Sequence, residues 1–511
     1  MWRSRRSSHW VLALALCLLW GTAWIGTRPL ADPDEGRYAE ISRVMIISQD
    51  WLTPQLDGRD HLSKPPITYW ITALGMLGLG FDAWGARIGV GLAFGLWLFV
   101  LLRIGAVRGA SRCDLFCIAV VHGTSLLPFI GGNLLTTDPF LSSAMGAASL
   151  FAMTAMVDAS KRQWMIRGFW LATAVAFLIK GPPALLLIPA LLICWRARLD
   201  PAAGERIILR PVVVVAACVA ASWYLIMVVQ EPERWKIFLL EEVVGRVSSS
   251  AMRRNAPFWL PALTLALGTL PWGLVALFGA RSWSLPSGGR RGSETDGASQ
   301  MDRRAVSTLF LGAWLITSLL VFTLSTSRMY LYVLPVSSVL SLWIGEGISS
   351  WIRGRRGRQG FCALLALSAI AACLALRIAG EDLPGYRSSE PLARQIQALS
   401  GANGAPVVFV GIASAPGLDF ALQERLPRVA IGKSDRAHAH DFDRASLIDL
   451  VRGRGKVLGV GTMPDLRRVA GFLEVEIRPA VEGTALRAAW LLPPTGKASG
   501  FAPSQASSIA R

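Results

Sequence analysis

Long apolar stretches separated by short arginine-rich segments are the feature that most constrains the fold of this chain. Val212 to Val229 and Phe361 to Leu376 contain no charged residue. Stretches of this length and composition are typical of helices that cross a bilayer. With 53% hydrophobic residues and a mean hydropathy of +0.44 over 511 residues, the chain has more apolar side chains than one water-soluble core of this size buries. We therefore predict an α-helical polytopic membrane protein.

The apolar stretches give the predicted spans. We place eleven of them at residues 9–26, 84–102, 113–131, 139–157, 167–180, 182–195, 211–229, 256–280, 305–325, 329–348 and 360–379. A further piece, 67–80, is short enough to be a re-entrant or interfacial helix rather than a crossing. The predicted total is about 11 to 13 transmembrane helices.

The basic residues test this arrangement. The net charge is +18, and the arginines lie in short clusters between apolar stretches. They do not gather on one soluble face, so we predict no nucleic-acid partner. If 67–80 makes no net crossing, all six clusters fall on one side: 3–6, 103–112, 161–167, 196–210, 281–304 and 353–358. The positive-inside rule makes that side and the N-terminus cytoplasmic. The C-terminus then lies on the opposite face, which in a bacterial inner membrane is the periplasmic one.

The two ends of the chain and its cysteines add less. We interpret the basic, then apolar N-terminus as an uncleaved first helix, because no small-x-small site precedes the acidic loop. All seven cysteines lie in or beside apolar stretches and indicate no disulfide framework.

We predict a transmembrane domain over 1–380, a small periplasmic α/β domain over 381–494 and a disordered tail over 495–511. Strand-like runs at 407–410, 428–431, 456–460 and 473–477, with a helix over 445–452, support the α/β prediction.

A run of acids follows the first predicted span, in the motif Asp32-Pro33-Asp34-Glu35-Gly36-Arg37-Tyr38-Ala39-Glu40-Ile41. Adjacent carboxylates at the mouth of a membrane cavity are a functional signal. The same acids at the start of an interfacial helix also favour its dipole and cap its first turn. The charge pattern alone leaves Asp34 and Glu35 open to both interpretations.

Cations and one further acid lie at the outer ends of other spans. Lys64 precedes Pro65 and either meets an anionic lipid head group or snorkels to the interface. Asp138 precedes Pro139, where we predict a helix N-cap in preference to a substrate ligand. Lys180 and Arg328 occupy two outer turns. Convergence of these groups on one face suits the binding of a sugar phosphate with an acid or base near its anomeric carbon.

Several motifs recur in the order found in a known family: 34–41, Lys64-Pro65 with Tyr69-Trp70, Lys180-Gly181-Pro182, Pro271-Trp272, and Ser327-Arg328 with Tyr332 and Pro335. On these motifs the chain resembles the family 39 glycosyltransferases of the GT-C fold over roughly residues 10–345. The branch that it resembles most is that of the bacterial 4-amino-4-deoxy-L-arabinose transferases of lipid A. The motif at 34–41 is the most specific, and the C-terminal part matches only in position and general type.

The resemblance implies a polyprenyl-phosphate sugar donor and an inverting transfer. Asp34, with Glu35, matches the acidic catalytic position of the first outer loop. Lys64 and Arg328 match the phosphate-binding cations, and Arg328 stands where the family usually has lysine. The substrate-binding positions that the resemblance implies are Arg37, Tyr38, Lys64, Asp138, Lys180, Arg246, Arg328 and Tyr332.

Two departures concern a metal. Relatives carry a glutamate before the Lys-Pro pair and a histidine three residues before the arginine that Arg246 matches. These positions are Ser63 and Val243 here. If the family's side chains hold a divalent ion, this chain lacks two ligands, and adjacent Glu241 and Glu242 do not make a closed site. We predict no metal ligands and leave the cofactor unknown.

The predicted function is a glycosyltransferase that moves a sugar from a polyprenyl-phosphate carrier to a lipid A-like or other envelope acceptor on the periplasmic face. The alternative is a transporter or flippase of lipid-linked envelope precursors. That alternative predicts charges near the bilayer midplane and an internal repeat. The sequence shows no repeat, and its strongest charged motifs lie at loop edges.

Overall fold

The computed structural model describes residues 2–158, 160–198, 211–244, 256–279, 296–410, 415–429, 444–473, 476–481 and 487–492. The chain forms two compact units. Unit 1 consists of Met1–Arg28, Gln49–Pro54 and His61–Gly380, and unit 2 of Pro29–Ser48, Gln55–Asp60 and Glu381–Arg511. The acid motif of the first outer loop therefore belongs to the same unit as the C-terminal part, a grouping that the sequence did not predict. The predicted tail, 495–511, lies outside the described residues.

Unit 1 is helical, and every predicted span falls on a helix or a helix pair. Its helices are α1 (Trp2–Thr22), α3 (Ile67–Leu79), α4 (Ala83–Val107), α5 (Arg112–Thr124), α6 (Leu126–Gly132), α7 (Thr137–Val157), α8 (Arg162–Lys180), η1 (Pro182–Leu186), α9 (Leu187–Arg198), α11 (Pro211–Gln230), η2 (Pro232–Arg234), η3 (Ile237–Val244), α13 (Leu260–Gly268), α14 (Trp272–Gly279), α15 (Asp296–Leu324), η5 (Tyr330–Val333), α16 (Leu334–Ile352) and α17 (Arg356–Ala379). Among the described residues, 6 helices are long and apolar enough to cross a membrane, or up to 8 if each bent pair is one span.

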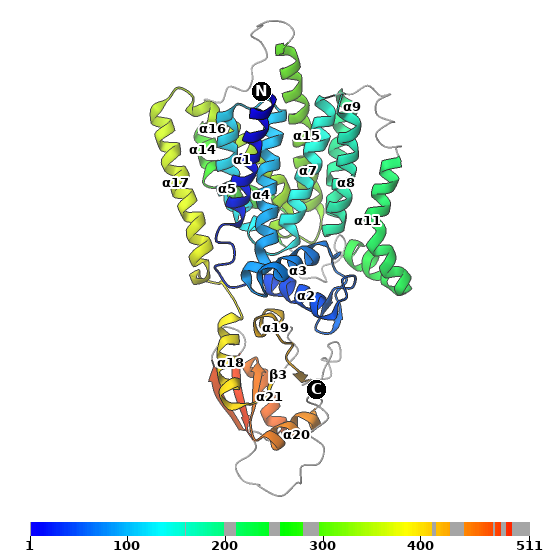
Figure 1. Cartoon of the computed structure of the whole chain (residues 1–511), viewed down its shortest axis with the longest axis vertical. Coiled ribbons are helices and arrows are strands. Elements are labelled where there is room, and N and C mark those ends of the chain that lie inside the picture. The colour runs from blue at the N-terminus through cyan, green and yellow to red at the C-terminus, as the bar shows by residue number, and fades with distance from the viewer. Residues whose placement is uncertain are drawn as a thin grey trace. The chain divides into compact units, whose positions relative to one another are not determined.

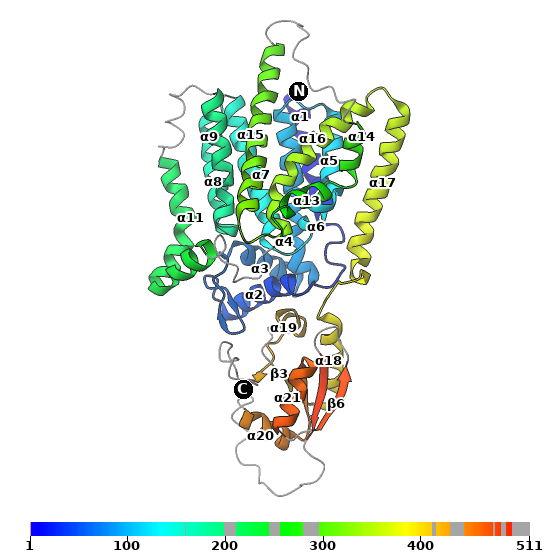
Figure 2. The same cartoon turned by 180° about the vertical axis from the view of Figure 1, so that it is seen from behind.

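Two predicted spans are not straight helices. The span at 113–131 is the pair α5 and α6, bent by 61°, and the span at 256–280 is the pair α13 and α14, bent by 87°. Figure 2 shows α13 and α14 as separate short pieces. Prolines explain both breaks. Pro128 has no N–H for the carbonyl of Thr124, and Pro271 has none for that of Leu267, so neither helix continues.

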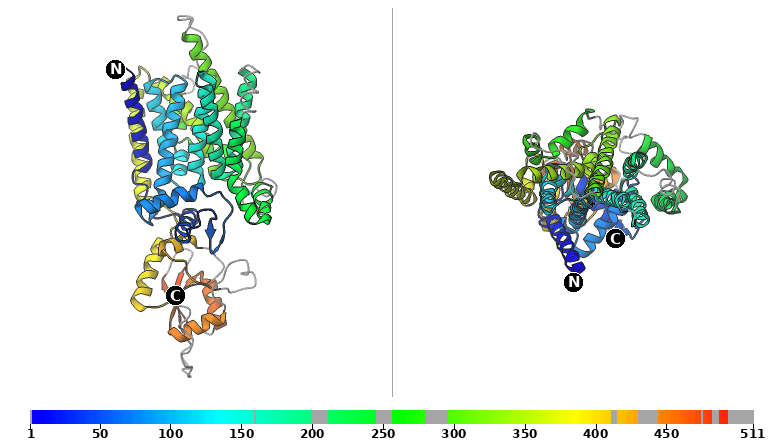
Figure 3. Two further views of the ribbon diagram at one scale, coloured as in Figure 1. Left: turned by 45° about the vertical axis from the view of Figure 1, so that its right-hand side comes forward. Right: turned by 90° about the horizontal axis from the view of Figure 1, so that it is seen from above.

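Helix α4 is central to unit 1, because it packs against α1, α3, α5 and α7. Helix α3, the short apolar piece whose role was open, lies crosswise to these helices in Figure 1 and Figure 3, as an interfacial helix does. Helices α11 and α17 lie on opposite flanks in Figure 1. Only 17% and 22% of their most apolar windows are buried, which leaves the remaining apolar surface to contact lipid.

Unit 2 combines a mixed sheet with helices. Its five strands are β3 (Val407–Val410), β4 (Arg428–Val429), β5 (Val457–Gly461), β6 (Glu476–Val481) and β7 (Arg487–Leu492), in the order β4-β3-β5-β7-β6. The pairs β3–β4 and β3–β5 are parallel, and β5–β7 and β6–β7 are antiparallel. Its helices are α2 (Asp34–Ser48), η6 (Gly380–Asp382, which begins at the last residue of unit 1), α18 (Glu390–Asn403), α19 (Pro416–Leu422), α20 (Arg444–Arg454) and α21 (Met463–Leu473). A hairpin of β1 (Gln55–Leu56) and β2 (Arg59–Asp60) completes it.

Candidate functional site

An ion pair joins two of the predicted site residues in unit 1. Lys180 is the last residue of α8, and Asp138 lies in the first turn of α7. The Lys180 Nζ donates to Asp138 Oδ1, and both side chains are 8% exposed. Helices α7 and α8 pack together and are joined at their other ends by a short link, so the start of one lies beside the end of the other. Each helix dipole favours the charge found there.

The N-cap of α7 is Thr136 and not, as predicted from the sequence, Asp138. Thr136 is the cap residue, and its hydroxyl accepts from the backbone N–H of Asp138 at 3.3 Å. Threonine in extended backbone satisfies one of the first donors of the helix, which frees the Asp138 carboxylate for Lys180. The prediction that Asp138 is itself the cap was wrong.

The turn after Lys180 brings in aromatic groups. Gly181 has φ +82°, and its N–H donates to the carbonyl of Phe177 at 2.6 Å, which ends α8. The Lys180 Nζ lies 5.1 Å from the centroid of the Tyr332 ring. The Tyr332 and Ser327 hydroxyl oxygens are 3.4 Å apart. The structure therefore gathers Asp138, Lys180 and Tyr332 into one cluster.

Arg328 has a different environment from Lys180. Its Nη1 donates to the carbonyl of Ala256 at 2.7 Å, and its Nη2 and Nε donate to that of Thr323 at 2.9 and 3.3 Å. Carbonyl oxygens orient a guanidinium without neutralising its charge, whereas the carboxylate of Asp138 compensates Lys180. Arg328 is half-buried and held in place by these bonds. This makes it a better fit than Lys180 for an anionic ligand.

Lys64 and its neighbours precede α3. Lys64 is buried, and its Nζ donates to the carbonyl of Ser63 at 2.7 Å. The hydroxyl of Ser63 lies 2.8 Å from His61 Nε2. Within the ranges that the structure describes, no three His, Cys, Asp or Glu side chains gather closely enough to hold a metal ion. The side chain of Val243 and the whole of Arg246 lie outside the described parts.

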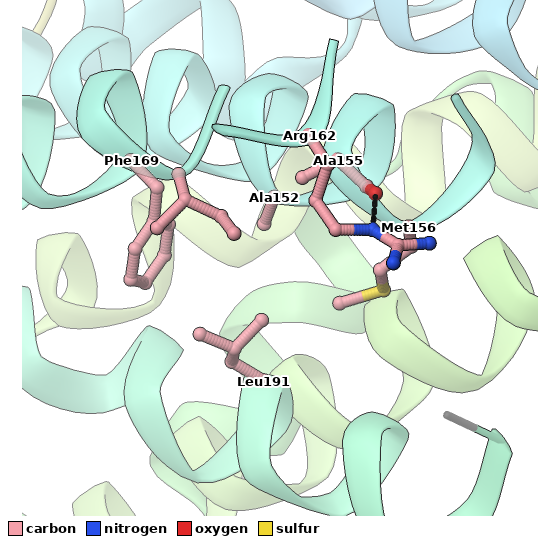
Figure 4. A pocket seen from close by; sticks show the side chains of 7 residues that line it. Ala152, Ala155, Met156, Arg162, Phe169 and Leu191 are labelled. Atoms are coloured by element: carbon pink, nitrogen blue, oxygen red, sulfur yellow. Dashed lines mark hydrogen bonds between the residues drawn. The ribbon is translucent and has the colours of Figure 1, made fainter. Parts of the chain in front are cut away.

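A small apolar pocket lies at the other end of α7 and α8 from the ion pair. Figure 4 shows Ala152, Ala155, Met156, Arg162, Phe169 and Leu191 on its walls. The Arg162 Nε donates to the carbonyl of Ala155 at 3.3 Å. Arg162 and Lys180 are the two ends of α8, about 27 Å apart along a helix of that length. The pocket is therefore separate from the predicted site residues.

The acid motif forms the first turns of α2 in unit 2. Asp34 is half-exposed, and its Oδ1 accepts from Arg37 Nη2 at 2.6 Å. Glu35 is 1% exposed, and its Oε2 accepts from the backbone N–H of Ala31 at 2.8 Å. The Glu35 carboxylate is thus tied to the backbone just before the helix. Asp34 keeps an accessible carboxylate, and the buried ring of Tyr38 lies 5.7 Å from the Arg37 guanidinium.

Further along α2, a buried group of charged residues was not predicted from the sequence. Glu40 and Arg43 form a two-pronged ion pair at 2.7 Å for each bond. Arg428 Nη2 bridges two carboxylates, Asp57 Oδ1 at 2.6 Å and Asp419 Oδ2 at 2.8 Å. Burial raises the pKa of Glu40 to about 7, with Arg43 acting in the opposite direction. Burial likewise raises the pKa of Asp419 to about 6, against the effect of Arg428.

One sequence signal pointed to part of this group. Asp57-Gly58 separates β1 from β2, and both residues have positive φ, 55° and 73°. An Asp-Gly pair between short extended runs is a strong hairpin signal, so Asp57 was within reach of sequence reasoning. Asp419 and Arg428 carry no motif, and their pairing depends on the fold of unit 2.

Comparison with protein-family models found no match. Comparison with curated proteins found similar sequences. The chain is 28% identical over 375 residues to undecaprenyl phosphate-alpha-4-amino-4-deoxy-L-arabinose arabinosyl transferase 2 of Pseudomonas fluorescens, covering 71% of this chain and 64% of that protein. It is 29% identical over 388 residues to the corresponding transferase of Pseudomonas aeruginosa, covering 72% and 66%. The chain thus spans less than two thirds of the length of these relatives.

The structural comparison covers nearly the whole chain. The crystal structure of ArnT from Cupriavidus metallidurans bound to undecaprenyl phosphate matches with a TM-score of 0.73 and 21% identity, over 94% of this chain and 97% of that one. Its apo state matches with a TM-score of 0.71 and 20% identity. The predicted fold class, a polytopic helical membrane protein of the GT-C type, is confirmed. The chain is an integral membrane protein, related in sequence to the undecaprenyl phosphate-aminoarabinose arabinosyl transferases and built on the fold of their solved structures.

Proposed function

We propose that the chain is an inverting glycosyltransferase that moves a sugar from a polyprenyl-phosphate carrier to a lipid A-like or other envelope acceptor. The observation that carries the proposal is the similarity to arabinosyl transferases over 71% of the chain, on a fold shared with ArnT. The bacterial inner membrane is the proposed location, with the N-terminus cytoplasmic and the reaction on the periplasmic side. The basic clusters between the spans support this orientation.

On the donor side, the proposal assigns the carrier phosphate to Arg328 and Lys64. Arg328 is held by two backbone carbonyls and retains its full charge for an anion. A fixed guanidinium stabilises the negative charge that grows on the phosphate as the sugar leaves. Lys180 is compensated by Asp138, so its proposed part is to fix that turn and place Tyr332 beside the substrate.

On the acceptor side, the proposal assigns the reacting group to Asp34. Its carboxylate is accessible and is oriented by Arg37. If the acceptor is a hydroxyl, Asp34 takes its proton as general base while the oxygen attacks the anomeric carbon from the face opposite the phosphate. If the acceptor is a phosphate, the nucleophile is already anionic, and Asp34 has only to orient it. Glu35 is buried, and its carboxylate accepts from the backbone N–H of Ala31, so the proposal gives it no direct part.

Transfer of labelled sugar from polyprenyl-phosphate donors to extracted envelope lipids tests the proposal. Membranes with the wild-type chain should label an acceptor, and the labelled lipid identifies it. Asp34→Asn should lower transfer to a hydroxyl by about 100-fold or more. The control is Asp382→Asn, which changes an exposed acid of the same unit and should leave transfer within about twofold of wild type.

Two results would count against the proposal. Full transfer by Asp34→Asn would remove Asp34 from the reaction. Absence of transfer from every donor, in wild-type protein that elutes as a single folded species, would overturn the transferase assignment and favour a transporter of lipid-linked precursors.

A further inference from the structure

We infer that the C-terminal module, which is the part of unit 2 after residue 380, supports the acid motif, with Arg428 and Asp419 as positioning residues for Asp34. This inference rests on the proposed function. Its physical basis is that α2 and the β1–β2 hairpin, which come from the first outer loop, fold with residues after 380 as one compact unit. The loop is therefore held by side chains more than 300 positions away in the sequence.

The first set of contacts is the buried charge network. Arg428 bridges Asp57 of the hairpin and Asp419 of α19 through the single nitrogen Nη2. On α2, Arg43 is fixed by Glu40 and donates through Nη1 to the carbonyl of Gln423, at the end of α19, at 3.1 Å. The side chains of Arg43, Glu40, Arg428 and Asp419 are each 6% exposed or less. Water competes little for bonds buried to this degree.

The second set lies at the start of α2. The Ser389 hydroxyl donates to Asp32 Oδ2 at 2.5 Å, and the Asp32 N–H donates to the carbonyl of Arg387 at 2.8 Å. Gly36 meets Gly417 of α19, where a Cβ added at Gly36 would lie 2.5 Å from the Cα of Gly417. These contacts fix the chain on both sides of Asp34, at residues 32 and 36.

These contacts hold α2 in place, and its first residue, Asp34, has an accessible carboxylate. Asp34 makes an ion pair only with Arg37 among the described ion pairs, and that partner lies on the same helix. Because Arg37 moves together with Asp34, the position of the pair depends on how α2 itself is held. The contacts from Ser389, Gly417 and Gln423 hold that helix directly. Arg428 and Asp419 act one step away, because they join the β1–β2 hairpin to α19, and both of these pack against α2. A displacement of about 1 Å in a reacting group costs roughly 100-fold in rate.

Transfer kinetics and amide hydrogen exchange of the full-length chain in detergent test the inference together. Arg428→Met should raise exchange in the segment 34–48 while leaving that in β5 unchanged. It should lower kcat by about 100-fold with the KM for the donor within about threefold, because the loss falls on the transition state. Arg428→Lys should restore most of kcat, because one nitrogen makes both bonds.

A second variant and a control keep the test decisive if Arg428→Met does not fold. Asp57→Asn keeps the side-chain shape in the hairpin and should show the same pattern more weakly. Arg468→Gln removes an arginine of the same module that is 65% exposed, and should leave exchange and kcat within about twofold of wild type.

The outcomes separate the two ideas. If the wild-type chain transfers sugar and kcat is unchanged in Arg428→Met and Asp57→Asn, the proposed function stands and the positioning role is overturned. Raised exchange at 34–48 with unchanged kcat would overturn it equally. Absence of transfer by the wild-type chain would overturn the proposed function, and the positioning role with it.

Discussion

The carboxylate of Asp138 and the ammonium of Lys180 face one another across two neighbouring helices, each 8% exposed. Asp138 lies in the first turn of α7, and Lys180 is the last residue of α8. A pair buried in this way contributes little net stability over an apolar pair, because both charges lose their hydration. Removal of one partner has a much larger effect, since the other charge remains buried without compensation.

A double-mutant cycle on this pair is the first prediction. Asp138→Asn and Lys180→Met should each lower the free energy of unfolding by about 3–5 kcal/mol. The double variant should lose less than the sum of the two. Thermal unfolding in detergent, followed by tryptophan fluorescence, measures all three. Additive losses would mean that the two side chains do not interact.

The same two helices provide the control for the cycle. Asp158 and Lys161 form an ion pair at the opposite ends of α7 and α8, with Lys161 62% exposed. Because solvent screens such a pair, Lys161→Met should leave the unfolding midpoint unchanged.

Arg328 gives the second prediction, because it occupies a position where the resembled family usually has lysine. Its fork makes three bonds to two carbonyls, which one ammonium cannot reproduce. Arg328→Lys should lower the free energy of unfolding by about 1–3 kcal/mol and retain most transfer, because the charge remains. Arg328→Met should lose both. Unfolding midpoints and initial transfer rates, measured on the same preparations, test both effects. An unchanged midpoint in the lysine variant would contradict a stabilising role for the bonds from Arg328 to the two carbonyls.

The membrane part of the fold was largely predictable from the sequence. Each predicted apolar stretch falls on a helix or a helix pair, because length and hydropathy largely determine what crosses a bilayer. Among the described residues 6 to 8 of these elements are long and apolar enough to span, fewer than the eleven predicted crossings. The bends at Pro128 and Pro271 were missed, although proline in a helix is a visible signal. In the C-terminal part the runs at 407–410 and 456–460 became strands, whereas β7 was missed. Its alternation is weak, and its partners β5 and β6 are what define it.

The sequence offered candidate site residues, whose roles stay predictions, but it did not predict their contacts. Motif order pointed to Asp34, Lys64 and Arg328. Asp138 compensates Lys180 because the end of α8 packs beside the start of α7. The spacing of charges in the sequence does not determine this packing. The grouping of α2 with residues after 380 depends on Asp419 and Arg428, whose partners are distant in sequence.

Glu40 gives the third prediction, on pH. Burial raises its pKa from 4.5 to about 7, and that of Asp419 shifts in the same direction. A carboxyl that holds its proton more tightly when folded stabilises the fold below its unfolded pKa, and this contribution is lost as pH rises through the folded value. The temperature midpoint of unfolding should therefore decrease as the pH is raised from about 5 to about 8. Glu40→Gln should flatten the dependence, and an equal slope in that variant would rule Glu40 out as its source.

Gly36 gives the fourth prediction, which concerns the contact between α2 and α19. A methyl group at Gly36 would meet the Cα and N of Gly417 at 2.5 and 2.8 Å, and backbone atoms cannot move aside as a side chain can. Gly36→Ala should therefore lower the free energy of unfolding by about 1–3 kcal/mol, even though alanine is the better helix former. It should also raise amide exchange over residues 34–48.

Gly401 of α18 is the matched control, because a Cβ there meets nothing within 4 Å. Gly401 lies in the last turn of α18, so Gly401→Ala should raise the free energy of unfolding by about 0.5 kcal/mol, at the lower end of the gain in a helix interior. Opposite signs for two identical substitutions in two helices of unit 2 would show that the Gly36–Gly417 approach, rather than helix propensity, fixes residue 36 of the acid motif. A gain at both positions would mean that α2 does not pack closely on α19.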